Sequence, residues 1–261
     1  MRLKNAVVLV TGASSGIGEA TALAFARAHC RLALCARRLD RLQAVAQRCR
    51  AAGAAAVTTK RADIGREAEA QAFVASALRD FEQVDVLVNN AGLGWSGRFE
   101  EMPLEKAREM VETNLLGAIW CTHAALPAML GAHRGVIINV ASTAAFRPVP
   151  YRSLYAATKA GLAALSHALR GELTGTGVKV SAVYPATTRT EFFSVSGGRM
   201  VGLVYPPWWV ARMIVRAARW PRRDVVVLPY RGVQLLEPVA GGFMDHSLGE
   251  ALRKLQPELG R

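Results

Sequence analysis

The sequence predicts an α/β protein with a doubly wound parallel sheet of about seven strands and helices on both faces. Short apolar runs rich in Val, Ile and Leu alternate with longer helical patterns along most of the 261 residues. These runs are continuous in hydrophobicity, which is typical of strands that are buried on both faces. Strict alternation of strand and helix favours parallel pairing through right-handed crossovers.

The predicted elements follow one another at regular intervals. Strands are expected at 6–10, 31–36, 55–62, 85–90, 135–141, 178–184 and 224–229. Helices are expected between them at 16–29, 38–52, 66–81, 104–130, 151–173 and 207–220. We therefore expect a single Rossmann-type domain over 1–261, in which 230–261 form a C-terminal extension with a weaker pattern.

The segment 186–206 interrupts the strand–helix rhythm and is rich in Gly, Ser and Thr. A loop this long in a compact domain is usually functional, so we expect a substrate lid. Apolar side chains of the lid and of neighbouring segments would line a pocket for an apolar substrate, and the alternative for most of them is packing in the core. They are Phe192, Phe193, Met200, Leu203 and Tyr205, with Trp208, Trp209, Phe146 and Trp95 nearby.

A glycine-rich turn joins the first predicted strand to the first helix in "VVLVTGASSGIGEA". Gly12 permits the tight turn, Gly16 lets the backbone approach a pyrophosphate, and Gly18 lets the helix pack against the sheet. The amides at the helix N-terminus would then face the anion. A purely structural turn is the alternative.

The end of the second strand indicates which dinucleotide would bind. An Asp or Glu there would hold the ribose hydroxyl of NAD, whereas arginines suit the 2′-phosphate of NADP. Ala36 stands in that place and is followed by Arg37 and Arg38, while the nearest acid is Asp40. The sequence therefore predicts NADP(H), unless the arginines only cap a surface turn.

Tyr155 and Lys159 are spaced i, i+4 on a predicted helix and so share one face. An ammonium ~4 Å from a phenol, at an effective dielectric constant of ~20, favours the phenolate by about 4 kcal/mol. We expect this interaction to lower the pKa of Tyr155 from ~10 towards ~7, which suits a general acid or base.

Other polar residues are predicted near the same edge of the sheet. Ser142 and Asn90 stand at the ends of two strands, and the carboxyl ends of strands bind ligands in such sheets. Ser142 could donate a hydrogen bond to a substrate oxygen, or it could be a simple turn residue. Asn114 interrupts a long helical pattern, and a buried asparagine there needs a partner or a water.

Composition limits the possible partners. The net charge is +13, but the arginines are scattered and form no basic stripe, so nucleic-acid binding is not expected. The four cysteines and five histidines lack zinc-site spacing, so we assign no metal. Free thiols and an initial apolar run, 6–10, too short for a signal peptide favour a cytoplasmic location. No apolar stretch is long enough to span a membrane.

Taken together, these motifs resemble the short-chain dehydrogenase/reductase family. The resemblance covers about residues 5 to 190 and follows the family's order. The matching pieces are the turn 11–18, Asp63-Ile64, Asn89-Asn90-Ala91-Gly92, Asn114, Ser142, Tyr155-x3-Lys159 and the segment 185–190.

The resemblance implies roles for the matching residues. Tyr155 would exchange a proton with the substrate oxygen, Lys159 would lower its pKa and bind the nicotinamide ribose, Ser142 would polarise the carbonyl, and Asn114 would hold a relay water. Asp63 would contact the adenine, Asn90 a ribose, and Thr190 the nicotinamide amide. The whole expected cofactor set is Gly12, Ser14, Ser15, Gly16, Ile17, Gly18, Arg37, Arg38, Asp63, Ile64, Asn90, Ala91, Gly92, Tyr155, Lys159, Pro185, Thr188 and Thr190.

The chain departs from the family's pattern at two positions. Ala186 follows Pro185 where a glycine is usual, and Ser15 stands where many NADP-binding members carry a basic residue. The prediction of NADP(H) therefore depends on Arg37 and Arg38.

The resulting hypothesis is an NADP(H)-dependent oxidoreductase that interconverts a ketone or aldehyde and an alcohol on a small-to-bulky apolar substrate. One alternative is a catalytically silent dinucleotide-binding sensor or scaffold. Another is a membrane-peripheral, lipid- or steroid-type reductase, because an apolar stretch with arginines occupies 220–236. By resemblance, helices 104–130 and 151–173 would form the interface of a homodimer or homotetramer.

Overall fold

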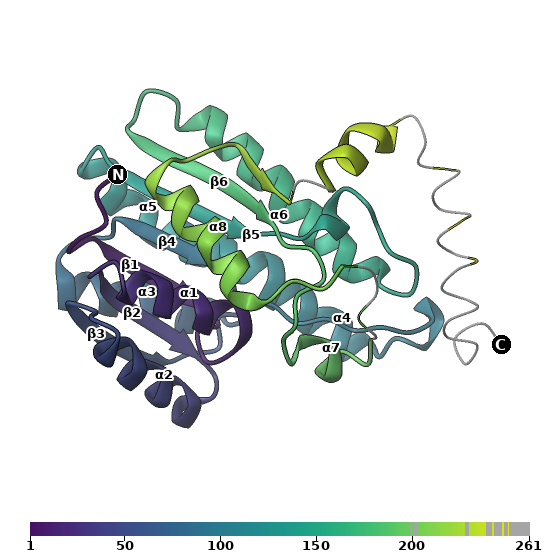
Figure 1. The fold of residues 1–261 in the computed structure, drawn as a ribbon, viewed down its shortest axis with the longest axis horizontal. Helices are drawn as coiled ribbons and strands as arrows, with labels where there is room; N and C mark the ends of the chain where they lie inside the picture. Colours follow the sequence, from purple (N-terminus) through teal and green to yellow (C-terminus); the bar gives the residue numbers. More distant parts are fainter. Residues whose placement is uncertain are drawn as a thin grey trace.

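The computed structural model describes residues 1–198, 200, 203–227, 230–238, 242, 247 and 250. Its strands form one fully parallel sheet in the order β3-β2-β1-β4-β5-β6-β7 (Figure 1). The strands are β1 (Val7–Thr11), β2 (Arg31–Ala36), β3 (Ala56–Arg61), β4 (Val86–Asn89), β5 (Gly135–Val140), β6 (Val178–Tyr184) and β7 (Asp224–Val226). The predicted doubly wound sheet is confirmed.

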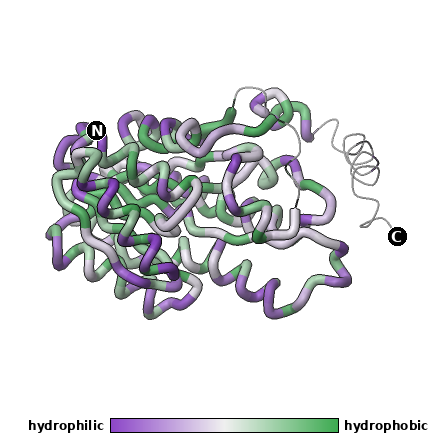
Figure 2. Tube along the Cα trace, turned by 60° about the horizontal axis from the view of Figure 1, so that its bottom comes forward, coloured by the Kyte–Doolittle hydropathy of each residue, from purple (hydrophilic) through white to green (hydrophobic). Residues whose placement is uncertain are grey.

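Helices cover both faces of this sheet. On one face lie α1 (Gly16–Ala26), α2 (Leu39–Ala51) and α8 (Pro207–Arg219). On the other lie α3 (Glu67–Phe81), α5 (Gly117–Gly131) and α6 (Ser153–Glu172). Each strand contributes alternate side chains to the two cores: Val8 and Val10 face α1, whereas Val7 and Leu9 face α3. Because both faces of the sheet are covered, its strands are continuous apolar runs. Figure 2 shows hydrophobic residues mainly in the interior of the trace and hydrophilic residues mainly around its outside.

The chain reverses its direction of travel across the sheet at β1. It moves outwards through β2 and β3, then returns to pair β4 with the other edge of β1. Loops after β1 and β4 therefore diverge, and they leave a crevice at the carboxyl ends of these strands. Such a topological switch point is where open α/β sheets bind ligands.

One predicted helix is divided in the structure. The pattern 104–130 forms α4 (Leu104–Val111), a π-helical turn (Glu112–Leu116) and α5. The break coincides with Asn114, the residue that interrupts the sequence pattern. Single π-turns inside helices often occur at functional sites, because they redirect side chains locally.

The lid and the extension are partly described. The lid contains a short helix, α7 (Phe192–Val195), and a bridge between Thr188 and Tyr205. Residues 199, 201 and 202 of the lid, and 228–229 of the last predicted strand, lie outside the described residues. Residues 230–238 are helical, and most of 239–261 also lies outside the described part. None of the helices within the described ranges is long and apolar enough to cross a membrane.

Candidate active site

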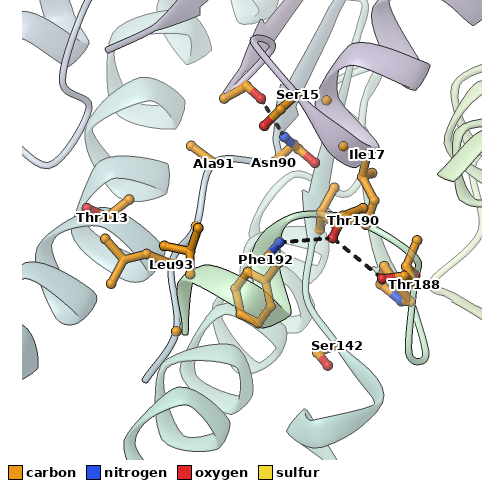
Figure 3. A pocket seen from close by; sticks show the side chains of 18 of the residues that line it. Ser15, Ile17, Asn90, Ala91, Leu93, Thr113, Ser142, Thr188, Thr190 and Phe192 are labelled. Carbon is orange, nitrogen blue, oxygen red and sulfur yellow. Dashed lines mark hydrogen bonds between the residues drawn. The ribbon is translucent and has the colours of Figure 1, made fainter. Parts of the chain in front are cut away.

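A cavity of about 400 Å³ opens at the carboxyl ends of the central strands. This volume is within the range of small-molecule and cofactor sites. Every residue of the predicted cofactor set lines it, and so does Ser142, whereas Asn114 lies behind the wall. Figure 3 shows this wall, with Thr190 of the lid between Ile17 of α1 and Phe192 of α7.

The glycine-rich turn leaves the backbone bare at the floor of the cavity. Gly12 has a φ of 66°, and a Cβ there would lie 2.8 Å from the Cα of Ala91. A Cβ on Gly18 would lie 2.2 Å from the carbonyl oxygen of Gly12. Both contacts are too short for any side chain, so only glycine allows this turn and this packing of α1. The N-cap of α1, Ser15, makes no side-chain capping bond, so the first amides of the helix remain available to an anion.

Hydrogen bonds tie the glycine-rich turn to the end of β4. The Thr11 hydroxyl accepts from the amides of Asn90 and Ala91, each at 3.0 Å. The Asn90 side chain in turn donates to the carbonyl of Thr11 at 2.9 Å. Asn90 therefore holds two strand ends together in addition to lining the cavity.

The two arginines after β2 are already paired with carboxylates. Arg37 donates to Glu109 at 2.8 Å and lies 3.9 Å from Asp63. Arg38 donates to the Ser15 hydroxyl at 2.8 Å and forms an ion pair with Glu191. The sequence predicts an anion site here, and the structure adds acidic partners that an incoming anion would meet.

The catalytic candidates stand on the opposite wall. Ser142 follows β5 and accepts a hydrogen bond from the Ala144 amide at 3.2 Å. Tyr155 lies in the first turn of α6, with its ring 5.4 Å from that of Phe192. Lys159 is 4% exposed, and its ammonium donates to the Val140 carbonyl at 2.8 Å.

The electrostatic effect predicted for Lys159 on Tyr155 is wrong for this structure. Burial raises the pKa of Tyr155, and a hydrogen bond with Ser142 and the charge of Arg152 offset the rise only in part. Burial also lowers the pKa of Lys159 to about 8. The Lys159 ammonium lies 5.9 Å from the centroid of the Tyr155 ring and is directed at the Val140 carbonyl. The helical spacing places the two residues on one wall, but burial sets the direction of both pKa shifts.

Asn114 is 1% exposed and uses its whole amide group in the π-turn. Its oxygen accepts from the Leu93 amide at 2.8 Å, and its nitrogen donates to the Leu93 carbonyl at 2.9 Å and to the Thr158 hydroxyl at 3.1 Å. It therefore fixes the loop after β4 against α6. A Cβ on Gly92 would lie 3.1 Å from this oxygen and 3.4 Å from the Lys159 ammonium, so Gly92 leaves room for both side chains.

The remaining predicted residues form the rim. The Thr188 hydroxyl donates to the Ala186 carbonyl at 2.8 Å. The Thr190 hydroxyl accepts from the Phe192 amide at 3.4 Å and donates to the Thr188 carbonyl at 3.5 Å (Figure 3). A Cβ on Gly16 would lie 3.0 Å from the Thr190 methyl group, so the lid rests on the glycine-rich turn.

The expectation of a broadly aromatic pocket is partly wrong. Phe192 and Phe193 line the cavity, together with Val149 and Leu93. The other predicted side chains do not. Met200, Leu203 and Trp208 are exposed, Tyr205 packs on Trp209 at 5.0 Å, Phe146 packs on Tyr184 at 5.5 Å, and Trp95 is absent from the lining.

Two charged residues of the cavity were missed from the sequence. Arg152 precedes α6, and its guanidinium lies 4.7 Å above the Phe193 ring, beside Tyr155. Glu191 lies at the start of the lid helix and reaches Arg38. The position of Arg152 in the cavity could have been predicted from the sequence, since it stands three residues before Tyr155. The pairing of Glu191 could not, because its partners are about 150 residues away.

Four free cysteines, Cys30, Cys35, Cys49 and Cys121, are buried, and burial raises the pKa of each thiol. In the part of the chain that the structure describes, no group of three or more His, Cys, Asp or Glu side chains could hold a metal ion.

A family model described as short chain dehydrogenase matches residues 6–197. The chain belongs to the short-chain dehydrogenase/reductase family. Among curated relatives, ketoacyl reductase HetN of Nostoc is 34% identical over 229 residues, which are 86% of this chain and 79% of that protein. 11-beta-hydroxysteroid dehydrogenase-like 4A of Arabidopsis thaliana is 41% identical over 173 residues, 66% of this chain, but the match spans only 58% of that longer protein.

Solved structures of the family share the fold. An alcohol dehydrogenase from the archaeon Thermococcus sibiricus, complexed with 5-hydroxy-NADP, superposes with a TM-score of 0.77 at 30% identity, covering 85% of this chain and 95% of the other. A short chain dehydrogenase/reductase from Burkholderia phymatum, in complex with NAD, gives a TM-score of 0.86 at 24% identity, covering 94% and 96%. The second likeness concerns the fold alone.

Proposed function

We propose that this oxidoreductase uses NADP(H) to interconvert a ketone or aldehyde and an alcohol, with Tyr155 as the proton-exchanging residue. The observation that carries the proposal is that one cavity contains both the residues expected to bind the cofactor and the residues expected to exchange the proton. The glycine-rich turn and Arg38 lie at one end, and Ser142, Tyr155 and Lys159 lie at the other. A dinucleotide that spans the cavity would present its nicotinamide to the catalytic end.

The turn fits a dinucleotide on two grounds. Gly12 and Gly18 allow the turn and the close packing of α1, and Gly16 leaves bare backbone on the cavity wall that a pyrophosphate can approach. The uncapped N-terminus of α1 supplies amides and a favourable dipole for the phosphate charge. When bound, the dinucleotide supplies or accepts the hydride.

Tyr155 supplies the proton in the direction of carbonyl reduction. Its raised pKa keeps the phenol protonated at neutral pH, which is the form that a proton donor needs. Ser142 hydrogen-bonds both the phenol and, in the complex, the substrate oxygen, so it aligns donor and acceptor. In the reverse direction Tyr155 accepts the alcohol proton, which the raised pKa disfavours at neutral pH.

Lys159 lines the cavity and Asn114 lies behind its wall, and both support the proton transfer. Burial lowers the pKa of Lys159 to about 8, so its ammonium gives up a proton more readily than that of a free lysine. Asn114 fixes Leu93 and the neighbouring loop through two hydrogen bonds and keeps the approach to Lys159 in place. Lys159 therefore supplies a proton, and Asn114 positions the loop beside it.

The preference for NADP(H) is supported by Arg37 and Arg38 at the end of β2, where no carboxylate of the strand itself is available for a ribose hydroxyl. The NADP-type ligand in the Thermococcus structure is consistent with it. The substrate end is apolar, through Phe192, Phe193 and Val149, which favours an apolar carbonyl compound. The name of the HetN relative, a ketoacyl reductase, fits the same reaction type.

The test is the oxidation of NADPH with a panel of apolar ketones, followed by absorbance. Tyr155→Phe should reduce turnover by at least ~100-fold, the usual contribution of a general acid. Tyr151→Phe is the matched control, because Tyr151 lies four residues earlier and does not line the cavity. Equal turnover in Tyr155→Phe and the native protein would refute the proposal. Binding of NADPH without turnover of any substrate would favour the sensor alternative.

A membrane-peripheral reductase is the second candidate. Trp220, Leu235 and Leu236 are 61%, 70% and 59% exposed, in the region that the sequence marks as apolar and basic. Co-sedimentation with vesicles containing anionic lipid, compared with neutral vesicles, tests it, and the absence of binding to both would exclude it.

We also propose a single-domain cytoplasmic enzyme that forms a homodimer or homotetramer through α4, α5 and α6. Light scattering tests the assembly, and a single species of monomer mass would refute it.

A further inference from the structure

Glu191 of the lid lies on the arginines that the proposed function assigns to the cofactor phosphate. One carboxylate oxygen accepts from Arg38, and the other accepts from Arg41 at 2.8 Å. Ser15 of the glycine-rich turn also hydrogen-bonds this carboxylate, and together these donors lower the pKa of Glu191 to about 2. Glu191 is therefore charged throughout the physiological range.

Glu191 differs from the other described acids around these arginines because it contacts Arg38. Asp63 also lines the cavity, but it lies beside Arg37, at 3.9 Å. Glu109 pairs with Arg37 from α4, but it does not line the cavity. Glu191 lines the cavity next to Arg38 and Ser15, and it directly follows Thr190, which rests on Gly16. A carboxylate from the lid thus takes the hydrogen-bond donors that would serve a phosphate at the same place.

We infer that Glu191 is an internal competitor of the 2′-phosphate and a determinant of cofactor choice. The inference rests on the proposed function, since it assumes that the adenosine end of a dinucleotide lies beside Arg38. A 2′-phosphate is attracted by Arg38 and Arg41 and repelled by Glu191. The 2′-phosphate must displace the carboxylate from Arg38, and this releases the start of the lid from the segment after β2. A cofactor without that phosphate leaves the Glu191–Arg38 pair intact, and the lid stays joined to the segment after β2.

The ion pair is partly exposed, with side-chain exposures of 41% for Arg38 and 36% for Glu191, so solvent screens it. Partly exposed pairs of this kind correspond to a few-fold effect on binding. Glu191→Gln keeps the size of the side chain and removes its charge. We expect the dissociation constant of NADPH to fall by about fivefold and that of NADH to change by less than about twofold.

The experiment titrates NADPH and NADH into the full-length native protein, Glu191→Gln and Glu191→Ala, using nicotinamide fluorescence or calorimetry at fixed ionic strength. Glu19→Gln is the matched control, because Glu19 pairs with Arg48 at the same 2.8 Å but does not line the cavity. The control should leave the ratio of the two dissociation constants unchanged.

Selective tightening of NADPH in both Glu191 variants supports the inference. Equal changes for both cofactors, weaker NADPH binding, or the same selective change in Glu19→Gln would overturn it while leaving the proposed function intact. If the native protein binds neither dinucleotide, the proposed function fails and this inference fails with it.

Discussion

Replacing Lys159 by methionine should stabilise the protein while removing a residue of the proposed proton path. Lys159 is 4% exposed, and burial lowers its pKa from 10.5 to about 8. At 1.36 kcal/mol per pKa unit, this corresponds to a cost of about 3 kcal/mol for holding the charged ammonium in the folded protein. Loss of its hydrogen bond to Val140 offsets about 1 kcal/mol of that, so the net gain at pH 7 is about 2 kcal/mol.

The pH dependence of this gain has a definite sign. Below about pH 8 the lysine is protonated in both states, and the native protein bears the full cost of burying the charge. Between about pH 8 and 10.5 the unfolded chain binds more protons at this residue than the folded protein, so the stability of the native protein rises with pH. Methionine does not titrate. The advantage of the variant should therefore be greatest near pH 7 and shrink as the pH approaches 10.

Urea denaturation of the native protein and Lys159→Met, each without added dinucleotide, measures this difference across pH 7 to 10. Lys179→Met serves as the control, because Lys179 is an exposed lysine of β6 and its replacement should change stability little. A Lys159→Met variant that is less stable at pH 7, or a difference that is constant across the range, would contradict the electrostatic reasoning.

Three further variants test separate parts of the site. Asn114→Leu removes the hydrogen-bond partner of the Leu93 amide and carbonyl, so urea denaturation should show that the free energy of unfolding falls by about 2–3 kcal/mol. A fall of less than about 0.5 kcal/mol would argue against a role of Asn114 in fixing this loop. Gly18→Ala places a Cβ 2.2 Å from the Gly12 carbonyl, so NADPH binding should weaken at least about tenfold through the shift of α1, and unchanged affinity would disagree with the close packing. Arg152→Met removes a charge that lowers the pKa of Tyr155, so the basic limb of the pH profile for ketone reduction should move to higher pH, and an unmoved profile would exclude this influence.

The fold was predictable because its signals are local. Continuous apolar runs such as that of β1 report burial on both faces, and alternation with helices then leaves parallel pairing as the consistent arrangement. The glycine-rich turn was also predictable, because Gly12 and Gly18 occupy positions at which backbone contacts exclude a side chain. The break at Asn114 was signalled by a polar residue in an apolar helical pattern, although the π-turn itself was not predicted.

The electrostatics of the site depend on contacts that no local pattern reports. Spacing places Tyr155 and Lys159 on one helix face, but the depth of burial decides both pKa values, and burial depends on the packing of α6 against β5 and the lid. The pairing of Glu191 with Arg38 joins segments about 150 residues apart. It therefore required the folded arrangement and could not be inferred from either segment alone.

The most direct test of the account follows an isotopic label from cofactor to product. Reduced NADP carrying deuterium at the transferable position is incubated with an accepted ketone, and mass spectrometry measures deuterium at the carbinol carbon in the native protein and Tyr155→Phe. We predict one deuterium per product molecule in the native protein and a rate at least ~100-fold lower in the variant, measured with saturating cofactor. Alcohol without the label, or equal rates in the two proteins, would contradict hydride transfer assisted by the Tyr155 proton.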